Sequence, residues 1–278
     1  MSSYLPSRRS SRLTLGALIA ASLVAVLLWS VTGVSKAAKP HQVAAKPTIV
    51  LVHGAWADAS SWTPVIQRLQ SHGYTVDAPP NPLRGVQSDS AYLASFLSAI
   101  KGPVVLVGHS YGGFLTTNAA VGDPNVKALV YVDAYIPAEG DTLNSLTSAM
   151  PGSMLGQSAF NPVPFGTGAG DVDLYIKPSL FPSIVANGLP ASQAAALAAE
   201  QRPLAAAALT EPSGPPAWKT IKSWDVIGTN DHVLPPAEQL VMAHRAHSKI
   251  TEVAAPHLSM LAAPGTVTKV IVQAANGS

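Results

Sequence analysis

The sequence predicts an α/β fold, in which helices flank a mostly parallel central sheet and an inserted cap covers it. Three observations lead to this prediction. Continuous apolar runs recur along the chain, as expected of strands that are buried on both faces. Segments with apolar residues at helical spacing lie between these runs. One run, Val104–Val107, leads directly into Gly-x-Ser-x-Gly and then into a helix-compatible segment.

The expected elements follow one another in alternation. Strands are expected over 48–52, 74–78, 104–107, 126–132, 224–228 and 250–253. Helices are expected over 60–72, 88–100, 114–121, 191–201, 235–246 and 267–275. Alternation of this kind predicts a parallel sheet with right-handed crossovers. In such sheets the active site lies beyond the carboxyl ends of the strands.

Start and stop signals support the individual elements. Ser60 is a candidate N-cap of the first helix, and Gly73 ends it. Ser88 or Asp89 is expected to begin the second helix, and Gly102 with the following proline to end it. Two consecutive prolines at 235–236 begin the helix before the last strand.

The stretch at about 137–216 breaks the pattern. It is rich in Pro, Gly, Ser and Ala and holds one clear helical segment. A second independent core is not expected from this composition, so we interpret the stretch as a cap inserted over the sheet. A partly disordered loop, above all near 166–170, is the alternative.

The first 38 residues differ from the rest. Three arginines precede an uncharged run over 13–34, and small residues follow around Ser35-Lys36-Ala37. This order is typical of a secretory signal peptide, although the run is also long enough for a membrane anchor. We therefore expect an exported protein, periplasmic or secreted, or one tethered to the membrane by this segment. Residues 39–46 have the composition of a linker to the domain at 47–278.

Charge and cysteine content exclude several classes of function. Four of the 17 basic residues lie in the first 38 residues, so 13 remain against 15 acidic ones. This balance leaves no basic patch and predicts no nucleic-acid partner. The chain has no cysteine, which excludes disulfides and thiolate catalysis. No phosphate-binding loop or metal-spaced His/Asp cluster is present, so neither a metal nor an organic cofactor is expected.

Ser110 is the expected nucleophile. It lies at the centre of Gly108-His109-Ser110-Tyr111-Gly112, where strand meets helix, and the small flanking glycines allow the two to approach closely. A serine needs a base to remove its proton and an acid to hold that base in the correct tautomer. A glycine-rich turn with an idle serine is the alternative reading.

The base and the acid are expected on loops after the last strands. His257 follows the final strand and is the candidate base, whereas His109 lies inside the elbow and His232 beside the acid's loop. Asp231 ends the preceding strand and is the candidate acid. Asp133, at the end of the 126–132 strand, is its rival.

Backbone amides are expected to bind the oxyanion. The amide of Tyr111 follows the nucleophile, and the amide of Ala55 lies in the turn after the first strand. Trp56, the next residue, is a candidate wall of the substrate pocket, although packing alone would also explain a large aromatic there.

These motifs resemble the α/β-hydrolase fold superfamily. The resemblance rests on His53-Gly54-Ala55-Trp56, Gly108–Gly113, Gly228-Thr229-Asn230-Asp231 and His257. With the stretch from Arg202 to Trp224, the HGAW motif resembles more narrowly a bacterial esterase-like family. That family is related to plant methyl esterases, plant hydroxynitrile lyases and pyrethroid-hydrolase-type carboxylesterases.

The resemblance and the residues together predict a serine hydrolase that cleaves small carboxylic esters through an acyl-enzyme. One alternative is a lyase similar to the hydroxynitrile lyases, which use the same triad and place a lysine in the pocket. A second is a cofactor-free perhydrolase. A third is a binding protein that has lost turnover, which the complete triad disfavours. The membrane is expected as a partner only through an uncleaved N-terminal segment.

Overall fold

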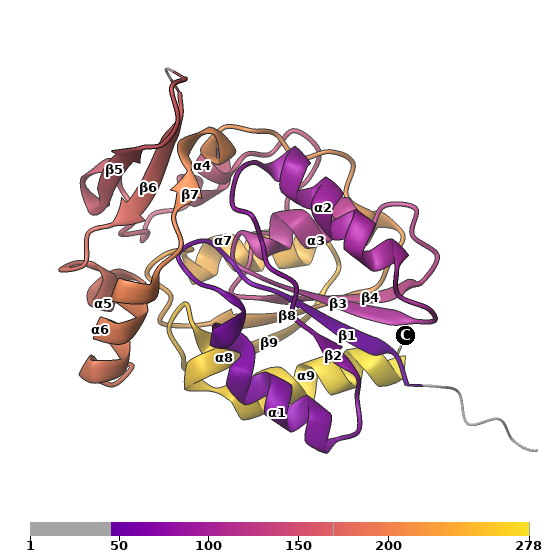
Figure 1. Cartoon of the computed structure of the whole chain (residues 1–278). Helices are drawn as coiled ribbons and strands as arrows, with labels where there is room; N and C mark the ends of the chain where they lie inside the picture. Colours follow the sequence, from indigo (N-terminus) through magenta and orange to yellow (C-terminus); the bar gives the residue numbers. More distant parts are fainter. Residues whose placement is uncertain (1–45, 169, 278) are drawn as a thin grey trace, which may run out of the picture. The chain divides into compact units, whose positions relative to one another are not determined.

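The computed structural model describes residues 46–168 and 170–277, and a six-stranded sheet runs through them (Figure 1). The strand order is β2-β1-β3-β4-β8-β9, and every neighbouring pair is parallel. The predicted α/β class with a mostly parallel sheet is therefore confirmed. The strands are β1 (Thr48–Val52), β2 (Val76–Asp77), β3 (Val104–His109), β4 (Val126–Val132), β8 (Ser223–Gly228) and β9 (Lys249–Val253).

Helices cover both faces of this sheet (Figure 1). One face carries α1 (Thr63–Ser71) and α9 (Pro264–Gly277), which pack against each other. The other face carries α2 (Val86–Ser98), α3 (Gly112–Ala119) and α7 (Pro236–Arg245). The short helices η1 (Ala59–Trp62) and α8 (Ser259–Ala262) lie where the strands end.

Two helix starts differ from the prediction. The side chain of Asp58, not Ser60, caps the first helical segment, because its Oδ1 accepts the Ser60 amide at 2.7 Å. The second helix begins at Val86, ahead of the expected start. Asp89 lies in its first turn and accepts the amide of Gly85 at 3.2 Å. A carboxylate satisfies helix N-terminal amides from either position.

A second, smaller sheet stands between β4 and β8 in sequence. Its order is β5-β6-β7, with antiparallel neighbours. The segment contains α4 (Leu143–Thr147), η2 (Gln157–Ala159), β5 (Phe160–Pro164), β6 (Val172–Ile176), α5 (Phe181–Ile184), α6 (Ala191–Glu200), β7 (Leu204–Ala205), η3 (Ala206–Leu209) and η4 (Ala217–Lys219). The expected helix at 191–201 is present, and the sheet was not foreseen.

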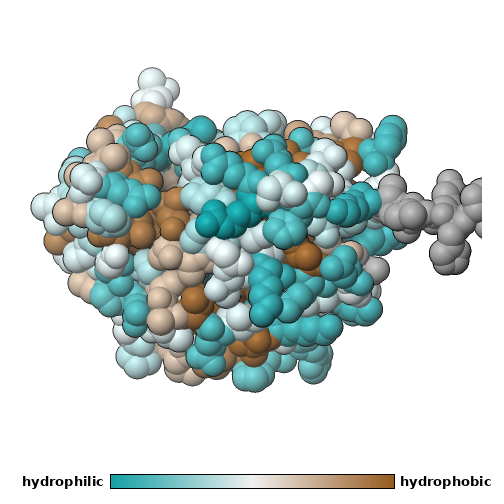
Figure 2. Space-filling view, turned by 90° about the horizontal axis from the view of Figure 1, so that it is seen from below, coloured by the Kyte–Doolittle hydropathy of each residue, from teal (hydrophilic) through white to brown (hydrophobic). Residues whose placement is uncertain are grey.

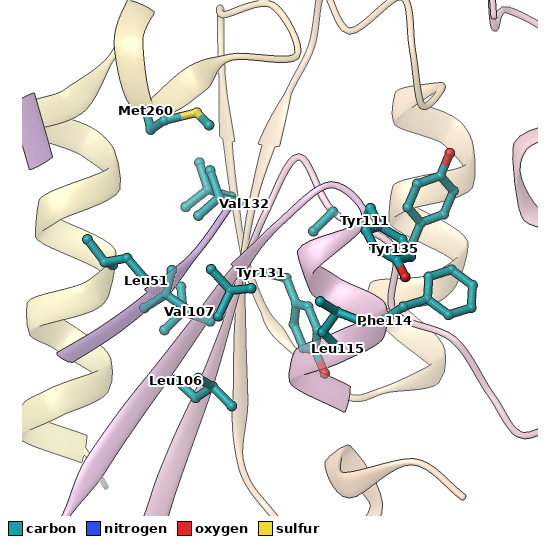
Figure 3. Packing of buried hydrophobic residues seen from close by; sticks show 14 of the residues in the cluster. Leu51, Leu106, Val107, Tyr111, Phe114, Leu115, Tyr131, Val132, Tyr135 and Met260 are labelled. Carbon is teal, nitrogen blue, oxygen red and sulfur yellow. The ribbon is translucent and has the colours of Figure 1, made fainter. Parts of the chain in front are cut away.

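The core lies between the sheet and its helices (Figure 3). Leu51, Leu106 and Val107 project from the central strands, and each is fully buried. Phe114 of α3 and Met260 of α8 are fully buried and pack on opposite faces of the sheet.

The surface of the described residues carries few large apolar side chains. Those that are exposed are Tyr92, Val121, Met154, Val163 and Val241. Figure 2 shows one face, on which hydrophilic residues separate small apolar patches. The predicted leader, 1–38, and residues 39–45 of the linker lie outside the described residues. Within 46–168 and 170–277, no helix has the length and apolarity needed to cross a membrane.

Candidate active site

Ser110 occupies a strained turn between β3 and α3. Its φ is 52°, a left-handed conformation that costs a non-glycine residue about 1–3 kcal/mol. The flanking glycines are required by close packing. A Cβ on Gly108 would lie 2.6 Å from the carbonyl oxygen of Gly112, and one on Gly112 would lie 2.6 Å from that of Val52. The elbow is therefore pressed against both α3 and β1.

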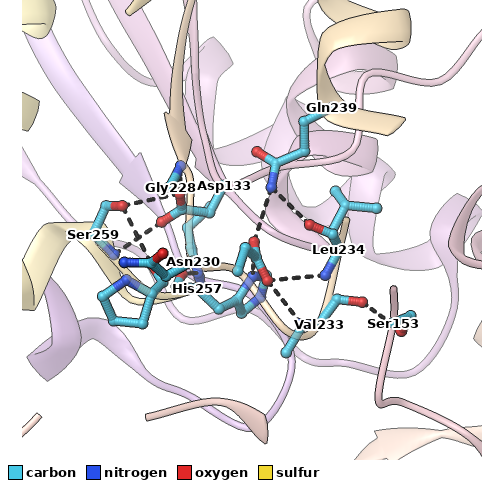
Figure 4. Close-up of polar contacts among 12 residues, drawn as sticks. Asp133, Ser153, Gly228, Asn230, Val233, Leu234, Gln239, His257 and Ser259 are labelled. Carbon is cyan, nitrogen blue, oxygen red and sulfur yellow. Dashed lines mark hydrogen bonds and ion pairs between the residues drawn. The ribbon is translucent and has the colours of Figure 1, made fainter. Parts of the chain in front are cut away.

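Asp231 and His257 form a buried pair at the carboxyl ends of β8 and β9 (Figure 4). His257 Nδ1 donates to Asp231 Oδ2 at 2.7 Å. Asp231 Oδ1 accepts the amides of Val233 and Leu234 at 2.7 and 2.9 Å. Gln239 Nε2 donates to Oδ2 at 2.9 Å. These donors fix the carboxylate, which in turn fixes the tautomer of His257 with Nε2 free to accept a proton.

Asp133, the rival acid, does not contact His257. It is fully buried and has a φ of 47°. Its Oδ1 accepts the Gly228 amide at 2.8 Å, and its Oδ2 accepts the Ser259 amide at 2.8 Å. Burial, and then the charge of Asp231, raise its pKa well above the ordinary value of a carboxyl group. Asp133 thus connects the loop of the acid to the loop of the base.

His109 supports the base from inside the elbow. Its Nε2 lies 2.9 Å from the carbonyl oxygen of His257, and the two imidazole rings are 4.8 Å apart. Burial, and then the neighbouring His257, hold the pKa of His109 well below its ordinary value. A neutral ring must carry its proton on Nε2 to donate to a carbonyl. The sequence excluded His109 as the base but gave no sign of this contact.

The two expected oxyanion donors lie beside the nucleophile. Ala55 and Tyr111 both line the cavity that contains Ser110. Within the part of the chain that the structure describes, neither amide donates a hydrogen bond. Gly54 holds the first turn against the elbow, because a Cβ there would lie 2.7 Å from the Ser110 Cβ. Such amides are ready to bind negative charge as it develops on a substrate.

Two buried groups hold these donors in place. His53 Nε2 accepts the Asn81 amide at 3.0 Å, and the Asn81 side chain donates to the His53 carbonyl at 3.0 Å. The Tyr111 hydroxyl donates to Asp89 Oδ2 at 2.9 Å. Burial, and then the charge of Asp89, raise the pKa of Tyr111. Both anchors lie far from the motifs in sequence, so sequence reasoning missed them.

The cavity over Ser110 is apolar. It holds about 400 Å³ of empty space, including its opening to solvent. None of the residues that line it carries a charge: Ala55, Trp56, Ser110, Tyr111, Tyr135, Leu143, Asn144, Thr147, Leu155, Phe160, Leu204 and Leu209. All seven of those after Tyr135 belong to the inserted segment, whose sequence pattern gave no basis for choosing them.

Trp56 connects the oxyanion turn to the inserted segment. Its indole donates to the Leu174 carbonyl of β6 at 2.7 Å, and its ring lies 5.8 Å from that of Phe160. Its φ of 56° is unusual for an aromatic residue. The expected wall residue therefore lines the cavity and also holds the cap down.

One contact expected of a catalytic triad is missing from the site. Among the hydrogen bonds of the described residues, none joins Ser110 Oγ to His257 Nε2. Contacts of this kind are commonly long without substrate and tighten when it binds. No three His, Asp or Glu side chains in the described ranges are placed to hold a metal ion.

The fold and the site define a class of protein: a parallel α/β protein with a serine at its strand-to-helix elbow and a His–Asp pair at neighbouring strand ends. The chain belongs to the alpha/beta hydrolase family, whose model matches residues 49–270.

Relatives within this family have several activities. The chain is 33% identical over 110 residues to the carbendazim hydrolyzing esterase of Nocardioides sp. (strain SG-4G), covering 35% of this chain and 46% of that protein. It is 30% identical over 106 residues to the alpha-hydroxynitrile lyase of Arabidopsis thaliana, covering 33% and 41%. These alignments span less than half of either relative.

Solved structures extend the likeness in fold to most of the chain. A pyrethroid hydrolase from Sphingobium faniae JZ-2 superimposes with a TM-score of 0.67 at 22% identity. The superposition covers 83% of this chain and 97% of that protein. At this identity the likeness concerns the fold alone.

Proposed function

We propose that the protein is a serine hydrolase that cleaves uncharged carboxylic esters through an acyl-enzyme. The observation that carries the proposal is the pair of unengaged amides, on Ala55 and Tyr111, beside a serine in a strained elbow. Acyl transfer requires such donors, because its tetrahedral intermediate carries an oxyanion.

Each residue then has one role. Ser110 Oγ attacks the acyl carbon and gives its proton to His257 Nε2, while Asp231 holds Nδ1–H. The oxyanion accepts from the two amides. When the intermediate collapses, the C–O bond to the alcohol breaks and His257 returns the proton to the leaving oxygen. Water, deprotonated by His257, then attacks the acyl carbon. As this second intermediate collapses, the bond from the acyl carbon to Ser110 Oγ breaks, His257 returns the proton to Oγ, and the acid is released.

The uncharged lining supports the substrate class. An ionised substrate group would lose its hydration in this cavity without gaining a partner of opposite charge. Both the acyl and the alcohol part are therefore expected to be neutral and largely apolar. The esterase among the curated relatives agrees with this class.

The lyase alternative depends on a lysine in the pocket. Among the described residues, no lysine lines the cavity over Ser110, so the lysine that the resemblance to these lyases implies is missing from it. No observation favours the perhydrolase alternative over ester hydrolysis, since both use the same triad.

Covalent labelling tests the proposal. An alkyl fluorophosphonate should phosphonylate Ser110, detected by mass spectrometry of the peptide, and block turnover of p-nitrophenyl esters in parallel. The same preparation is assayed for mandelonitrile cleavage and for peroxide-dependent halide oxidation in acetate. Cleavage of mandelonitrile without ester turnover would reject the esterase proposal, as would labelling of another residue.

A further inference from the structure

A second hollow adjoins the cavity over Ser110. Asn144, Thr147 and Leu155 line both hollows, which therefore share this part of their walls. The second one is more open and runs along α4 and the loop at 148–156, and we call it the outer groove. It holds about 570 Å³ of space, including open solvent. A substrate too long for the cavity over Ser110 would extend past the shared side chains into the outer groove.

The wall of the outer groove is fixed to the loop of the catalytic acid. Ser153 Oγ donates to the Val233 carbonyl at 2.7 Å (Figure 4). The Met154 amide donates to the His232 carbonyl at 2.8 Å. Val233 is itself one of the amide donors to Asp231. The groove is therefore a formed feature beside the site and not a loose surface loop.

The chemistry of the groove fits a neutral chain. No charged residue lines it. The hydroxyls of Ser148 and Ser153 are engaged with backbone carbonyls, at 2.7 Å in each case. The remaining lining includes Met150, Pro151 and Leu155, which offer apolar contact. Asn144 is exposed at the junction, and its side-chain amide makes no hydrogen bond within the described residues.

We propose that the outer groove is a subsite for a long, uncharged substituent of the ester, which lies along Met150, Pro151 and Leu155 while the ester itself is at Ser110. The substrate class is then esters with one aliphatic chain too long for the cavity alone. Asn144 binds a polar atom of that chain, such as an ether or amide oxygen, where it crosses the junction. This inference rests on the proposed function.

Gly156 provides a way to fill the groove. It lines the groove, has a φ of −98°, and has open space within 4 Å of where a Cβ would stand. A larger side chain is therefore accepted without strain at the lining of the groove. Gly265, in α9, is exposed and equally uncrowded, and it lies outside both hollows, so Gly265→Leu is the matched control.

The test compares p-nitrophenyl octanoate with p-nitrophenyl acetate in the full-length protein. A half-buried methylene contributes about twofold, so three to four methylenes lying in the groove contribute about tenfold. We expect Gly156→Leu to lower the octanoate-to-acetate ratio of kcat/KM about tenfold, Gly156→Ala to lower it less, and Gly265→Leu to leave it unchanged. Octyl acetate, compared with ethyl acetate, shows whether the acyl or the alcohol part occupies the groove.

A binding measurement distinguishes failure of the groove proposal from failure of the proposed esterase function. Ser110→Ala cannot form an acyl-enzyme, and its Kd for each intact ester is measured by calorimetry with and without Gly156→Leu. A selective loss for the octanoate supports the groove even if the native protein turns over no ester. An unchanged ratio for both the acyl and the alcohol series, or an equal loss for long and short esters, overturns the proposal.

Discussion

Replacing Asp231 by Asn separates the catalytic role of this residue from its structural role. The carboxylate accepts from two amides through Oδ1, and from Gln239 and His257 through Oδ2. An asparagine oriented with its oxygen at Oδ1 keeps both amides. Its NH₂ group then faces Gln239 and His257, each of which is a donor in the native protein.

Both neighbours have a way to adapt. The amide of Gln239 has a buried Oε1 without a partner, so a flip of this group lets Oε1 accept from the new NH₂. The flip releases the Leu234 carbonyl, to which Gln239 Nε2 donates at 2.9 Å. One buried carbonyl without its donor costs about 1–3 kcal/mol of the free energy of unfolding. The fold should survive.

The imidazole of His257 adapts at the expense of catalysis. To accept from the new NH₂, Nδ1 must lose its hydrogen, which moves to Nε2. A ring protonated at Nε2 no longer accepts the proton of Ser110. We expect kcat for an ester substrate to fall by about 10⁴, equivalent to about 5.5 kcal/mol of transition-state stabilisation.

Asp133→Asn is the matched comparison, because it makes the same atom exchange at a fully buried carboxylate that does not contact His257. Its new NH₂ must face either the Ser259 or the Gly228 amide, so stability should fall by about 2–4 kcal/mol. Displacement of the two loops that Asp133 connects should lower kcat by a factor of no more than about 10². Steady-state kinetics and urea unfolding measure both quantities. If Asp133→Asn lost more activity than Asp231→Asn, the assignment of the acid would be refuted.

Three further predictions concern groups around the site and in the core. Burial raises the pKa of Asp225 well above the unfolded value of 3.8; the neighbouring Val226 amide offsets a little of this rise without forming a hydrogen bond of normal geometry. Asp225 should therefore lower the native free energy of unfolding by up to about 1.4 kcal/mol per pH unit as pH rises above about 4. Asp225→Asn should make this fall shallower in urea titrations, and the raised pKa of Asp133 accounts for a fall that remains. His109→Phe keeps the ring contact but removes the donor to the His257 carbonyl. His109→Phe should lower kcat more than it changes KM, and His109→Gln should regain part of the lost kcat. Equal kcat and KM in the native protein and both variants would contradict a positioning role for His109. Gly113→Ala places a Cβ against the backbone carbonyl oxygen of Tyr135, so thermal unfolding should show a loss of several kcal/mol or no folded protein.

The centre of the sheet was predictable from sequence because its strands are nearly continuous apolar runs. Val104–His109 is buried throughout, and Val126–Val132 is buried except at Lys127, so a helix in either place would have almost no polar side to expose. The candidate nucleophile was equally clear, since Ser110 stands between a strand and a helix that both had independent support.

The inserted segment was not predictable in the same way. β5 contains Pro162 and Pro164 and is mostly exposed, so its sequence carries neither alternation nor a buried run. Its pairing with β6 is set by Trp56, Arg84 and other residues from distant parts of the chain. Arg84, for example, forms an ion pair with Asp173 at 2.8 Å.

The supporting groups of the site were hidden for a related reason. His109 is adjacent to the nucleophile, yet its partner lies 148 residues further along the chain. Asp89 reaches Tyr111 across 22 residues, and Asp133 reaches Ser259 across 126. A single sequence contains no sign of such pairs, whereas motifs confined to one turn can be recognised directly.

Hydrolysis of p-nitrophenyl butyrate by the native protein and by Ser110→Ala tests the central claim most directly. Loss of the nucleophile should remove a factor of about 10⁴ or more from kcat, with the fold unchanged by circular dichroism. Turnover by the native protein alone is the predicted result. Equal turnover by the two proteins would contradict the claim, because the reaction would then take place without the elbow serine.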